Sequence, residues 1–497
     1  FAAYSANAGD ASQFSDDGGK KDKEIVFVAK AVVDRLDELD PSQGVVHHEG
    51  VKIEVFGALP GEEISFTRPV KKRNATLVEV MKASEHRALP RCGVYGRCGG
   101  CSLMHMTHEK QLEVKHQLAL DVLRQEGVEP AEVLPPLHAQ QYGYRHSARP
   151  NVRHLEDRED RVGGKVLVGF RHKWVMGSQP VDRCAVLAEP INSFFQDAAD
   201  VINRMSVRDK VPTVEVMMGD TEKALLLRHL SPLSSQDKRL LTEFARAQGF
   251  HLYTQAEGID SIKLFYSPTG FVPSAPPVEV SAEPFSPLFY TLPNHGVKIH
   301  FNPTDFIQVN SEVNRKLVDQ AIEFLELTKK DRVLDLFCGL GNFTLPVARY
   351  AKSVMGVEWQ EYTVQKARTN ALISGLTNVT FHSDDLLNPK GLRWLKPGKV
   401  QFNKMVIDPP RSGAIAVLER LFAEHGMRPD RIVYVSCNPE TLARDLAFLQ
   451  TQGYATEKMR TADMFPNTNH IESIALLQHI EPNRKSTTRP AAAAGAQ

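Results

Sequence analysis

The sequence lacks the features of membrane proteins and of disulfide-stabilised proteins. No apolar run approaches the ~20 residues that a membrane-spanning helix needs, and the mean hydropathy is negative. Cysteine occurs only 6 times in 497 residues, which is too rare for a disulfide scaffold. Neither sign of charge predominates, because 60 Lys and Arg residues are balanced by 60 Asp and Glu residues. An integral membrane protein is therefore excluded, and the balance gives no sign of an extended polyanion-binding surface.

The remaining composition is ordinary for a globular protein, with 42% hydrophobic and 24% charged residues. The length predicts roughly three domains. Residues 1–24 and 481–497 show no apolar periodicity, and we expect both to be disordered tails. We find no apolar secretion signal, and the acidic residues of the first tail argue against a transit peptide. We therefore expect a cytoplasmic protein with reduced thiols.

Residues 25–84 alternate between apolar and polar residues in the manner of short β-strands. Four or five such stretches are separated by Gly, Pro and Asn. So many strands in about 60 residues predict a small β-barrel of the OB type, a common oligonucleotide-binding fold. A small β-domain without a ligand is the alternative interpretation.

Residues 85–300 mix helical and strand patterns. A helix is predicted within 104–130, and a β-hairpin is predicted with its turn at Gly219-Asp220. A second helix is predicted over 234–249, where serine at the start and glycine at the end are typical caps. Residues 271–293 contain six prolines and predict a loop.

From residue 301 to about 480, five strand patterns alternate with helical patterns. This alternation predicts an α/β domain with a doubly wound parallel sheet. Ligands of such sheets bind at the carboxyl ends of the strands. The first strand runs into Gly339 and Gly341, and Glu358 ends the next strand. Two glycines allow a close backbone approach, and a carboxylate there can accept hydrogen bonds from ribose, which favours S-adenosylmethionine over NAD. A plain sheet turn with an incidental Glu is the alternative.

Four of the cysteines suggest a metal centre. Cys92, Cys98 and Cys101 form a C-x5-C-x2-C pattern interspersed with glycines, and Cys184 follows much later. Glycines between thiols let several sulfur atoms converge on a metal ion or an iron–sulfur cluster. The C-x2-C spacing also occurs in structural zinc sites. Spacing alone leaves both interpretations open.

The other two cysteines lie in the α/β region. Cys338 beside the glycine loop is expected to be a small packed residue. Cys437 ends a predicted strand, at the sheet edge where ligands bind, and a thiol there can serve as a nucleophile if its thiolate is favoured. A buried cysteine at a strand end is the alternative. Glu472, taken alone, is typical of a solvated or ion-paired residue.

Ordered motifs run through residues 25–480, and they are GALPGE, the cysteine pattern, YRHSARP, VGFR, DFIQVN, LDLFCGLGNFTLP, DPPRSG, SCNPETLARDL and DMFPNTNHIE. With these motifs the chain resembles the RNA uracil-C5-methyltransferase family, and in particular its iron–sulfur-containing members. The resemblance implies a Rossmann-like S-adenosylmethionine-dependent methyltransferase domain over 301–480 and an OB-type TRAM barrel over 25–84. It further implies an α+β central domain over 85–300 that carries the cluster, with helix 104–130 packed on the catalytic domain.

The resemblance also implies roles for single residues. Cys437 would be the nucleophile and Glu472 the base that removes a proton, while Arg149 and Phe306 would contact the target uracil. The residues of the S-adenosylmethionine site would be Gln308, Phe337, Asn342, Glu358, Asp385 and Asp408. The ligands of a [4Fe–4S] cluster would be Cys92, Cys98, Cys101 and Cys184. Asp385 departs from the family pattern, which can have Asn there, and so do the second proline of DPPR and Pro150.

The implied reaction is methylation of C5 of a specific uridine in 23S rRNA, through a covalent adduct between cysteine and uracil C6. The same chemistry on tRNA or on another rRNA site is one alternative, and a non-catalytic RNA-binding iron–sulfur protein is another. Residues 51–91 hold eight Lys and Arg against five Asp and Glu, and 143–173 hold eight against four. We therefore expect local basic faces that bind ribosomal RNA. We also expect no membrane contact, no obligate protein partner and a monomeric protein.

Overall fold

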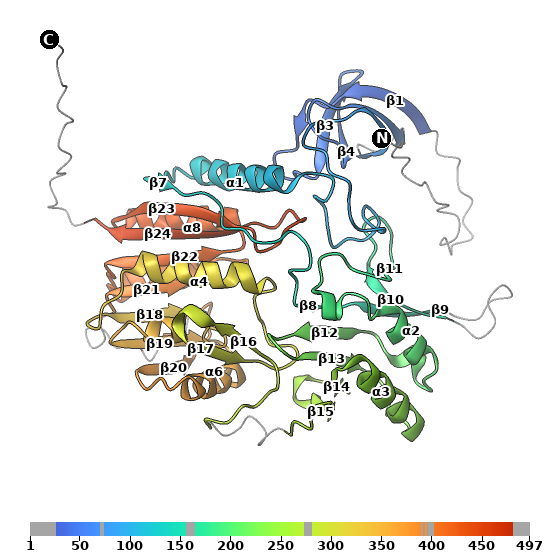
Figure 1. The fold of residues 1–497 in the computed structure, drawn as a ribbon. Helices are drawn as coiled ribbons and strands as arrows, with labels where there is room; N and C mark the ends of the chain where they lie inside the picture. The colour runs from blue at the N-terminus through green and yellow to red at the C-terminus, as the bar shows by residue number, and fades with distance from the viewer. Residues whose placement is uncertain are drawn as a thin grey trace, which may run out of the picture.

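The computed structural model describes residues 26–69, 74–155, 165–272, 281–388, 391–392, 395 and 402–480. Both predicted tails lie outside these residues. Figure 1 shows an N-terminal β-sheet in blue, a central green part below it, and a layered α/β part that runs from yellow to red. Every helix within the described residues is too short or too polar to span a lipid bilayer.

The N-terminal sheet has six strands in the order β1-β5-β6-β4-β3-β2, where the sequence predicts four or five. Its apolar residues alternate inward and form a core of their own around Val46, Ile53 and Phe66, all fully buried. Gly44 allows the sheet to fold back on itself, since a Cβ there would lie 2.7 Å from the carbonyl oxygen of Ala58. The strands are β1 (Val26–Val32), β2 (Arg35–Leu36), β3 (Gln43–His48), β4 (Val51–Phe56), β5 (Glu63–Pro69) and β6 (Asn74–Lys82).

The central part contains a five-stranded sheet in the order β15-β14-β13-β12-β8 and a three-stranded sheet in the order β11-β10-β9. The predicted hairpin is present as β12 and β13, and the helix predicted over 234–249 is α3 with a Ser234 cap and a left-handed Gly249. The elements are β8 (Ser147–Ala148), β9 (Asn151–Leu155), β10 (Lys165–Arg171), β11 (Ser178–Pro180), α2 (Phe195–Asn203), β12 (Val214–Met218), β13 (Lys223–Arg228), α3 (Ser235–Gln248), β14 (His251–Gln255) and β15 (Lys263–Tyr266), with 3-10 turns at Glu189–Ile191, Arg208–Lys210, Ile259–Ser261 and Pro293–His295.

The prediction of a loop over 271–293 is wrong for its last residues. Residues 289–292 form β16 (Phe289–Leu292), which pairs with β17 (Val297–His300). Tyr290 and Leu292 point into the core of the α/β part, and this burial outweighs the proline-rich context that suggests a loop. Residues 273–280 of the predicted loop lie outside the described part of the chain.

The α/β part is built on an eight-stranded sheet in the order β20-β19-β18-β21-β22-β24-β23-β7. The five predicted strands are present and parallel, but the expectation of a parallel sheet throughout is wrong, since β24 runs antiparallel between β22 and β23. The strands are β7 (Glu132–Val133), β18 (Arg332–Leu336), β19 (Ser353–Glu358), β20 (Val379–Ser383), β21 (Lys404–Ile407), β22 (Arg431–Ser436), β23 (Tyr454–Ala462) and β24 (Glu472–His479).

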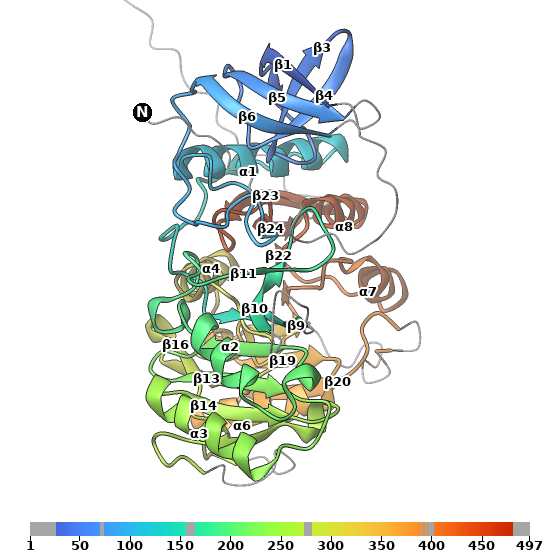
Figure 2. The same ribbon diagram turned by 90° about the vertical axis from the view of Figure 1, so that its right-hand side faces the viewer.

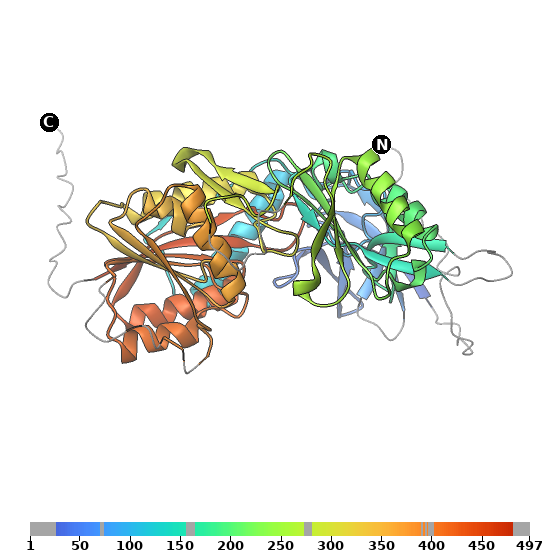
Figure 3. The same cartoon turned by 90° about the horizontal axis from the view of Figure 1, so that it is seen from below.

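Helices cover both faces of this sheet, as Figures 1 and 3 show. The helix predicted over 104–130 is α1, which occupies His108–Gln125 and lies along α8 and β23. Its apolar residues Ala119 and Leu123 join the core of the α/β part. The helices are α1 (His108–Gln125), α4 (Ser311–Leu325), α5 (Thr344–Ala348), α6 (Glu361–Ile373), α7 (Ile415–Glu419), which continues as a π-turn over Arg420–Glu424, and α8 (Pro439–Thr451).

Figure 2 shows the N-terminal sheet stacked on α1, with the α/β part beneath. The structure therefore joins α1 and β7, both from the segment assigned to the central domain, to the catalytic sheet. One face of the central sheet also shares a core with this part, through Met217, Leu226 and Tyr253.

A buried carboxylate links the loop after β21 to the strand β22. Asp445 of α8 accepts hydrogen bonds from the Tyr434 hydroxyl at 2.5 Å and from the Ala414 N–H at 2.6 Å. We expect Asp445→Ala to lower the thermal midpoint by roughly 4–8 °C, because two buried donors lose their acceptor at a cost of about 2 kcal/mol. Glu440→Ala, an exposed change on the same helix, is the control. Equal midpoints for the two variants would contradict this prediction.

Candidate active site

The register of the sheet brings Cys437 and Glu472 together. Cys437 directly follows β22, and Glu472 is the first residue of β24. Ser436 pairs with Ser473 across the antiparallel strands, so Cys437 and Glu472 adjoin this pair at the same end, and the charge of Glu472 acts on the thiol. On its other side Glu472 pairs with Ala462 of β23. The two predicted reacting groups therefore lie at one point on the edge of the sheet, where parallel strands present their carboxyl ends.

The side chains of Glu472, Asp408 and Arg411 determine the electrostatics at this point. Glu472 is only 2% exposed, and its pKa is raised well above the usual range because of burial and the nearby charge of Asp408. Burial also raises the pKa of Asp408 to about 7. Arg411 opposes the shift at Glu472. The site can therefore hold protonated carboxyl groups near neutral pH, which suits groups that take up and release protons.

Burial raises the pKa of the Cys437 thiol, and the charges of Glu472 and Asp408 raise it further, while Arg411 lowers it. The Arg411 guanidinium lies 3.0 Å from the Nδ1 atom of His470. The backbone carbonyl oxygen of Arg411 accepts a hydrogen bond from the Asn438 side chain at 3.2 Å. Sequence reasoning missed Arg411 as a neighbour of the thiol. The available signal was its place just after β21, beside β22 in the sheet.

The glycine loop follows β18, and its backbone is left-handed at three positions. Phe337 adopts a left-handed conformation with φ of 62°, and it is followed by Gly339 and Gly341, which have φ of 53° and 97°. Glu358 ends β19 and accepts a hydrogen bond from the Gly339 N–H at 3.1 Å. The loop and the carboxylate predicted to bind a nucleoside therefore lie in direct contact.

Asn342 is held in place by groups that the sequence analysis does not single out. Its amide exchanges two hydrogen bonds of 2.9 Å with the Asn314 amide, and it accepts another from the Tyr290 hydroxyl at 3.0 Å. Asp335 of β18 is also buried, and burial raises its pKa to about 7. Tyr290 was not predicted to contact Asn342 because it lies in the predicted proline-rich loop. Asn314 was not predicted because no local sequence pattern distinguishes it.

The other residues predicted for the cofactor and substrate sites have fewer contacts with the glycine loop and the Cys437 region. Asp385 follows β20, and its side chain accepts a hydrogen bond from the Leu387 N–H at 3.1 Å. Gln308 is half-buried just before α4. Phe306 nearby is 78% exposed, which leaves its ring free to stack on a base. Arg149 lies in the central part, where its guanidinium pairs with Glu215 at 2.7 Å.

The four cysteines of the predicted metal centre line one cavity of about 280 Å³. Cys92, Cys98, Cys101 and Cys184 come from two segments far apart in sequence, and all are free thiols. Arg145 and Arg149 also line the cavity. Burial raises the pKa of Cys98 to about 11, and the charges of neighbouring thiolates add to the shift.

Among the described residues, no group of three or more Cys, His, Asp or Glu converges on a point suited to one metal ion. Tetrahedral thiolates around zinc would lie roughly 3.8 Å apart, because each Zn–S bond is about 2.3 Å. The four cysteines therefore share one cavity, but the structure does not draw their sulfur atoms together at zinc spacing.

A family model described as tRNA (Uracil-5-)-methyltransferase matches residues 290–480. A protein of Alkalilimnicola ehrlichii named 23S rRNA (uracil(1939)-C(5))-methyltransferase RlmD is 42% identical over 442 residues, which cover 88% of this chain and 94% of that protein. A Legionella pneumophila (strain Paris) protein of the same name is 38% identical over 446 residues, with 88% and 94% covered.

A solved structure has the same fold over most of the chain. It is Pyrococcus abyssi tRNA (uracil-54, C5)-methyltransferase in complex with S-adenosyl-L-homocysteine, with a TM-score of 0.64 and 23% sequence identity. The match covers 90% of this chain and 99% of that one. The α/β part therefore has the fold of an S-adenosylmethionine-dependent methyltransferase.

The charges around Cys437 predict how its reactivity depends on pH. Alkylation by iodoacetamide requires the thiolate, so the rate should rise with pH and reach half its maximum above the ordinary thiol pKa. Glu472→Gln removes a negative charge and should move this midpoint to lower pH, whereas Arg411→Gln should move it to higher pH. Mass spectrometry of the Cys437 peptide measures the rate. Shifts in the same direction for both variants would contradict the prediction.

Proposed function

This chain belongs to the RNA uracil-C5-methyltransferase family, and from that membership we propose that it methylates C5 of a specific uridine in 23S rRNA. Relatives that are 37–42% identical to this chain are named for that activity. The match covers nearly their whole length. The observation that supports the chemistry is the pairing of Ser436 with Ser473, since Cys437 and Glu472 directly adjoin this pair.

Uracil C5 is a weak nucleophile, so the ring must first be activated. The Cys437 thiolate adds to C6, and the electrons of the C5–C6 double bond move toward the O4 carbonyl to give an enolate with electron density at C5. Arg411 is the cation near the thiol that favours its ionised form. S-adenosylmethionine, when bound, would supply an electrophilic methyl group to C5, and its sulfur would keep the electrons of the broken S–CH3 bond and leave as a neutral thioether.

C5 then carries both a methyl group and a hydrogen, and the reaction is completed by a base. Glu472 takes the C5 proton, the C–H electrons restore the C5–C6 double bond, and the C6–S bond breaks to release the thiolate. The buried position of Glu472 raises its pKa, which improves it as a proton acceptor. Cys437 returns to its starting state.

The glycine loop supports the assignment of the S-adenosylmethionine site. Glu358 can accept hydrogen bonds from ribose, and Phe337 and Asp408 directly follow the neighbouring strands β18 and β21, with Asn342 in the loop after β18. We assign Gln308 and Asp385 to the same site from the family resemblance. The solved relative contains the demethylated product of this cosubstrate. The left-handed backbone at Phe337 and the tightly held Asn342 amide give a preformed surface.

We assign RNA binding to the other two parts of the chain. The six-stranded sheet with a hydrophobic core of its own supports an OB-type TRAM domain over residues 25–84. The exposed Phe306 ring suits stacking on an extruded uracil. Arg149, paired with Glu215, would approach a uracil carbonyl with its exposed guanidinium. The central part over 85–300 joins these surfaces to the methyltransferase domain of 301–480.

We also propose that Cys92, Cys98, Cys101 and Cys184 hold a [4Fe–4S] cluster. Their shared cavity and the absence of a disulfide among them support this assignment. Buried thiolates repel one another, and a positively charged inorganic core would offset that repulsion, with Arg145 on the cavity wall adding to it. The cluster would order the segments that face RNA, without redox turnover.

The nucleophile is tested with Cys437→Ala. We expect this variant to bind rRNA fragments with unchanged affinity, to lose methyl transfer, and to form no covalent complex with RNA that carries 5-fluorouridine. Mass spectrometry of digested RNA measures the product. Unchanged transfer would remove Cys437 from the mechanism, and methyladenosine or methylcytidine in place of 5-methyluridine would overturn the proposed reaction. Cys338→Ala, beside the cofactor loop, is the matched cysteine control for covalent trapping.

The substrate is tested by competition. We expect an rRNA fragment to be methylated at least about tenfold faster than tRNA at equal concentration, a difference of roughly 1.4 kcal/mol in the activation barrier. Mapping of the product identifies the uridine. Faster methylation of tRNA would assign the same chemistry to the other RNA class.

The cluster is tested with Cys101→Ser. Anaerobically purified protein should contain about four iron atoms per chain and absorb visible light, whereas the variant should lose most of the iron and the absorbance. Iron and zinc are measured by elemental analysis. Stoichiometric zinc in the unaltered protein would contradict the assignment.

A further inference from the structure

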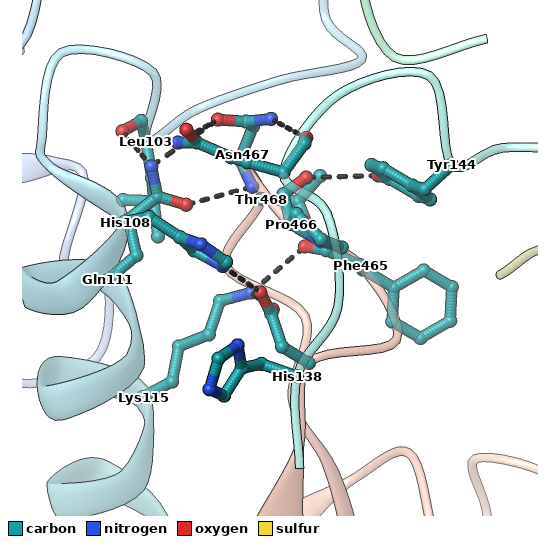
Figure 4. A network of polar contacts seen from close by, with 12 residues as sticks. Leu103, His108, Gln111, Lys115, His138, Tyr144, Phe465, Pro466, Asn467 and Thr468 are labelled. Atoms are coloured by element: carbon teal, nitrogen blue, oxygen red, sulfur yellow. Dashed lines mark hydrogen bonds and ion pairs between the residues drawn. The ribbon is translucent and has the colours of Figure 1, made fainter. Parts of the chain in front are cut away.

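The loop between β23 and β24, residues 463–471, is held from outside the methyltransferase domain. It begins next to Ala462 and ends next to Glu472, and these two residues pair across the strands. The position of Glu472 therefore depends on where both ends of the loop lie. Figure 4 shows α1 on one side of this loop, with Gln111 and Lys115 directed at it.

The first contact is a buried ion pair. The Lys115 ammonium lies 2.8 Å from Asp463 Oδ1 and also donates to the Phe465 carbonyl oxygen at 2.9 Å. The His108 ring reaches the other Asp463 oxygen at 2.9 Å. The side chains of Lys115 and Asp463 are 4% and 1% exposed. Burial acts to raise the pKa of Asp463, but Lys115 and His108 hold it below its usual range, so the carboxyl group is ionised.

The second contact is a pair of amides. The Asn467 N–H donates to Gln111 Oε1 at 2.9 Å, and the Asn467 side chain donates to the Gln141 carbonyl oxygen at 2.8 Å. Asn467 is fully buried and adopts a left-handed backbone with φ of 68°. Asparagine tolerates this conformation better than most residues. The Asn467 side chain also accepts a hydrogen bond from the Gln141 amide at 2.9 Å, so the residue is held by two separate segments of the N-terminal half.

The loop also contacts the cysteine segment. The Asn467 carbonyl oxygen accepts hydrogen bonds from the Ser102 N–H at 2.9 Å and the Leu103 N–H at 3.0 Å, directly after Cys101. The Tyr144 hydroxyl donates to the Pro466 carbonyl oxygen at 2.9 Å. These bonds extend the support of the loop from α1 to the wall of the cysteine cavity.

We propose that Gln111, Lys115, Asp463 and Asn467 form a loop clamp whose role is to position Glu472 for removal of the C5 proton. They are positioning residues, since none of them belongs to the pair of reacting groups. The inference rests on the proposed function. It separates the two halves of the reaction: the clamp governs the proton-removal step, while thiol addition and methyl transfer depend on Cys437, which directly follows β22 and lies outside the loop.

The variants are chosen to loosen the clamp without leaving a buried charge unpaired. Asn467→Gly keeps the left-handed backbone and removes the side-chain amide. The double variant Lys115→Met, Asp463→Leu removes both charges together, because deleting one partner alone would leave the other uncompensated. Gln117→Ala, on the exposed face of α1, is the matched control. Glu472→Gln is the reference for loss of the base.

Two measurements separate the steps. Covalent trapping on 5-fluorouridine RNA requires thiol addition and methyl transfer but no proton removal. On ordinary uridine RNA, the fraction of enzyme held as a covalent adduct on a denaturing gel reports slow proton removal. We expect the rate at which both clamp variants trap 5-fluorouridine RNA to stay within about threefold of that of the unaltered chain. The fraction held as an adduct on uridine RNA should rise about tenfold, since misplacement of a catalytic group by about 1 Å can cost up to roughly 100-fold in rate.

The outcomes are distinct. Adduct accumulation with normal trapping, as in Glu472→Gln, supports the clamp. A parallel loss of trapping and turnover, or no change in either, would overturn it. If the unaltered chain fails to trap 5-fluorouridine RNA, the proposed chemistry itself fails, and the positioning role fails with it. Gln117→Ala should match the unaltered chain in both measurements.

Discussion

The catalytic region depends on one structural constraint, the insertion of β24 antiparallel between β22 and β23. Because side chains alternate faces along a strand, a slip of one residue would turn Glu472 to the opposite side of the sheet from Cys437. Six residues of β24 are paired on both sides, and most of them are buried. This buried pairing fixes the register more firmly than a surface loop could, so the distance between nucleophile and base is set by the core.

Local patterns allowed much of the fold to be predicted. The five parallel strands, the glycine loop and the capped helix α3 each have a signal within a few residues, and each is present. The antiparallel β24, the strand β16 and the hydrogen bonds around Asn342 were missed because they depend on partners far away in the chain. Cys437 was suggested by its place at the end of a strand, but Glu472 and its link to Cys437 were suggested only by family resemblance, since no periodicity connects residues 35 positions apart. The mixed sheet explains why they meet.

The even balance of charge has a structural counterpart. Several acidic and basic side chains pair in buried positions between segments that are distant in sequence, including Arg87 with Glu62 and Lys366 with Asp305, besides the pair on the 463–471 loop. Such pairs cost desolvation energy and add little net stability, but they strongly disfavour arrangements that separate the partners. They occur where the N-terminal sheet meets its linker and where the loops meet the catalytic core. The chain thus uses paired charges to specify how its parts fit together.

The short strand β7 has a consequence for what can fold alone. It contributes only Glu132 and Val133, yet it covers the outer edge of β23 and so ends the catalytic sheet. A fragment limited to residues 290–480 would expose this edge, with backbone donors and acceptors unpaired and the carboxylate of Asp463 without Lys115. An exposed strand edge invites pairing between molecules, so such a fragment would self-associate. The autonomous unit of this enzyme is therefore larger than the segment that performs its chemistry.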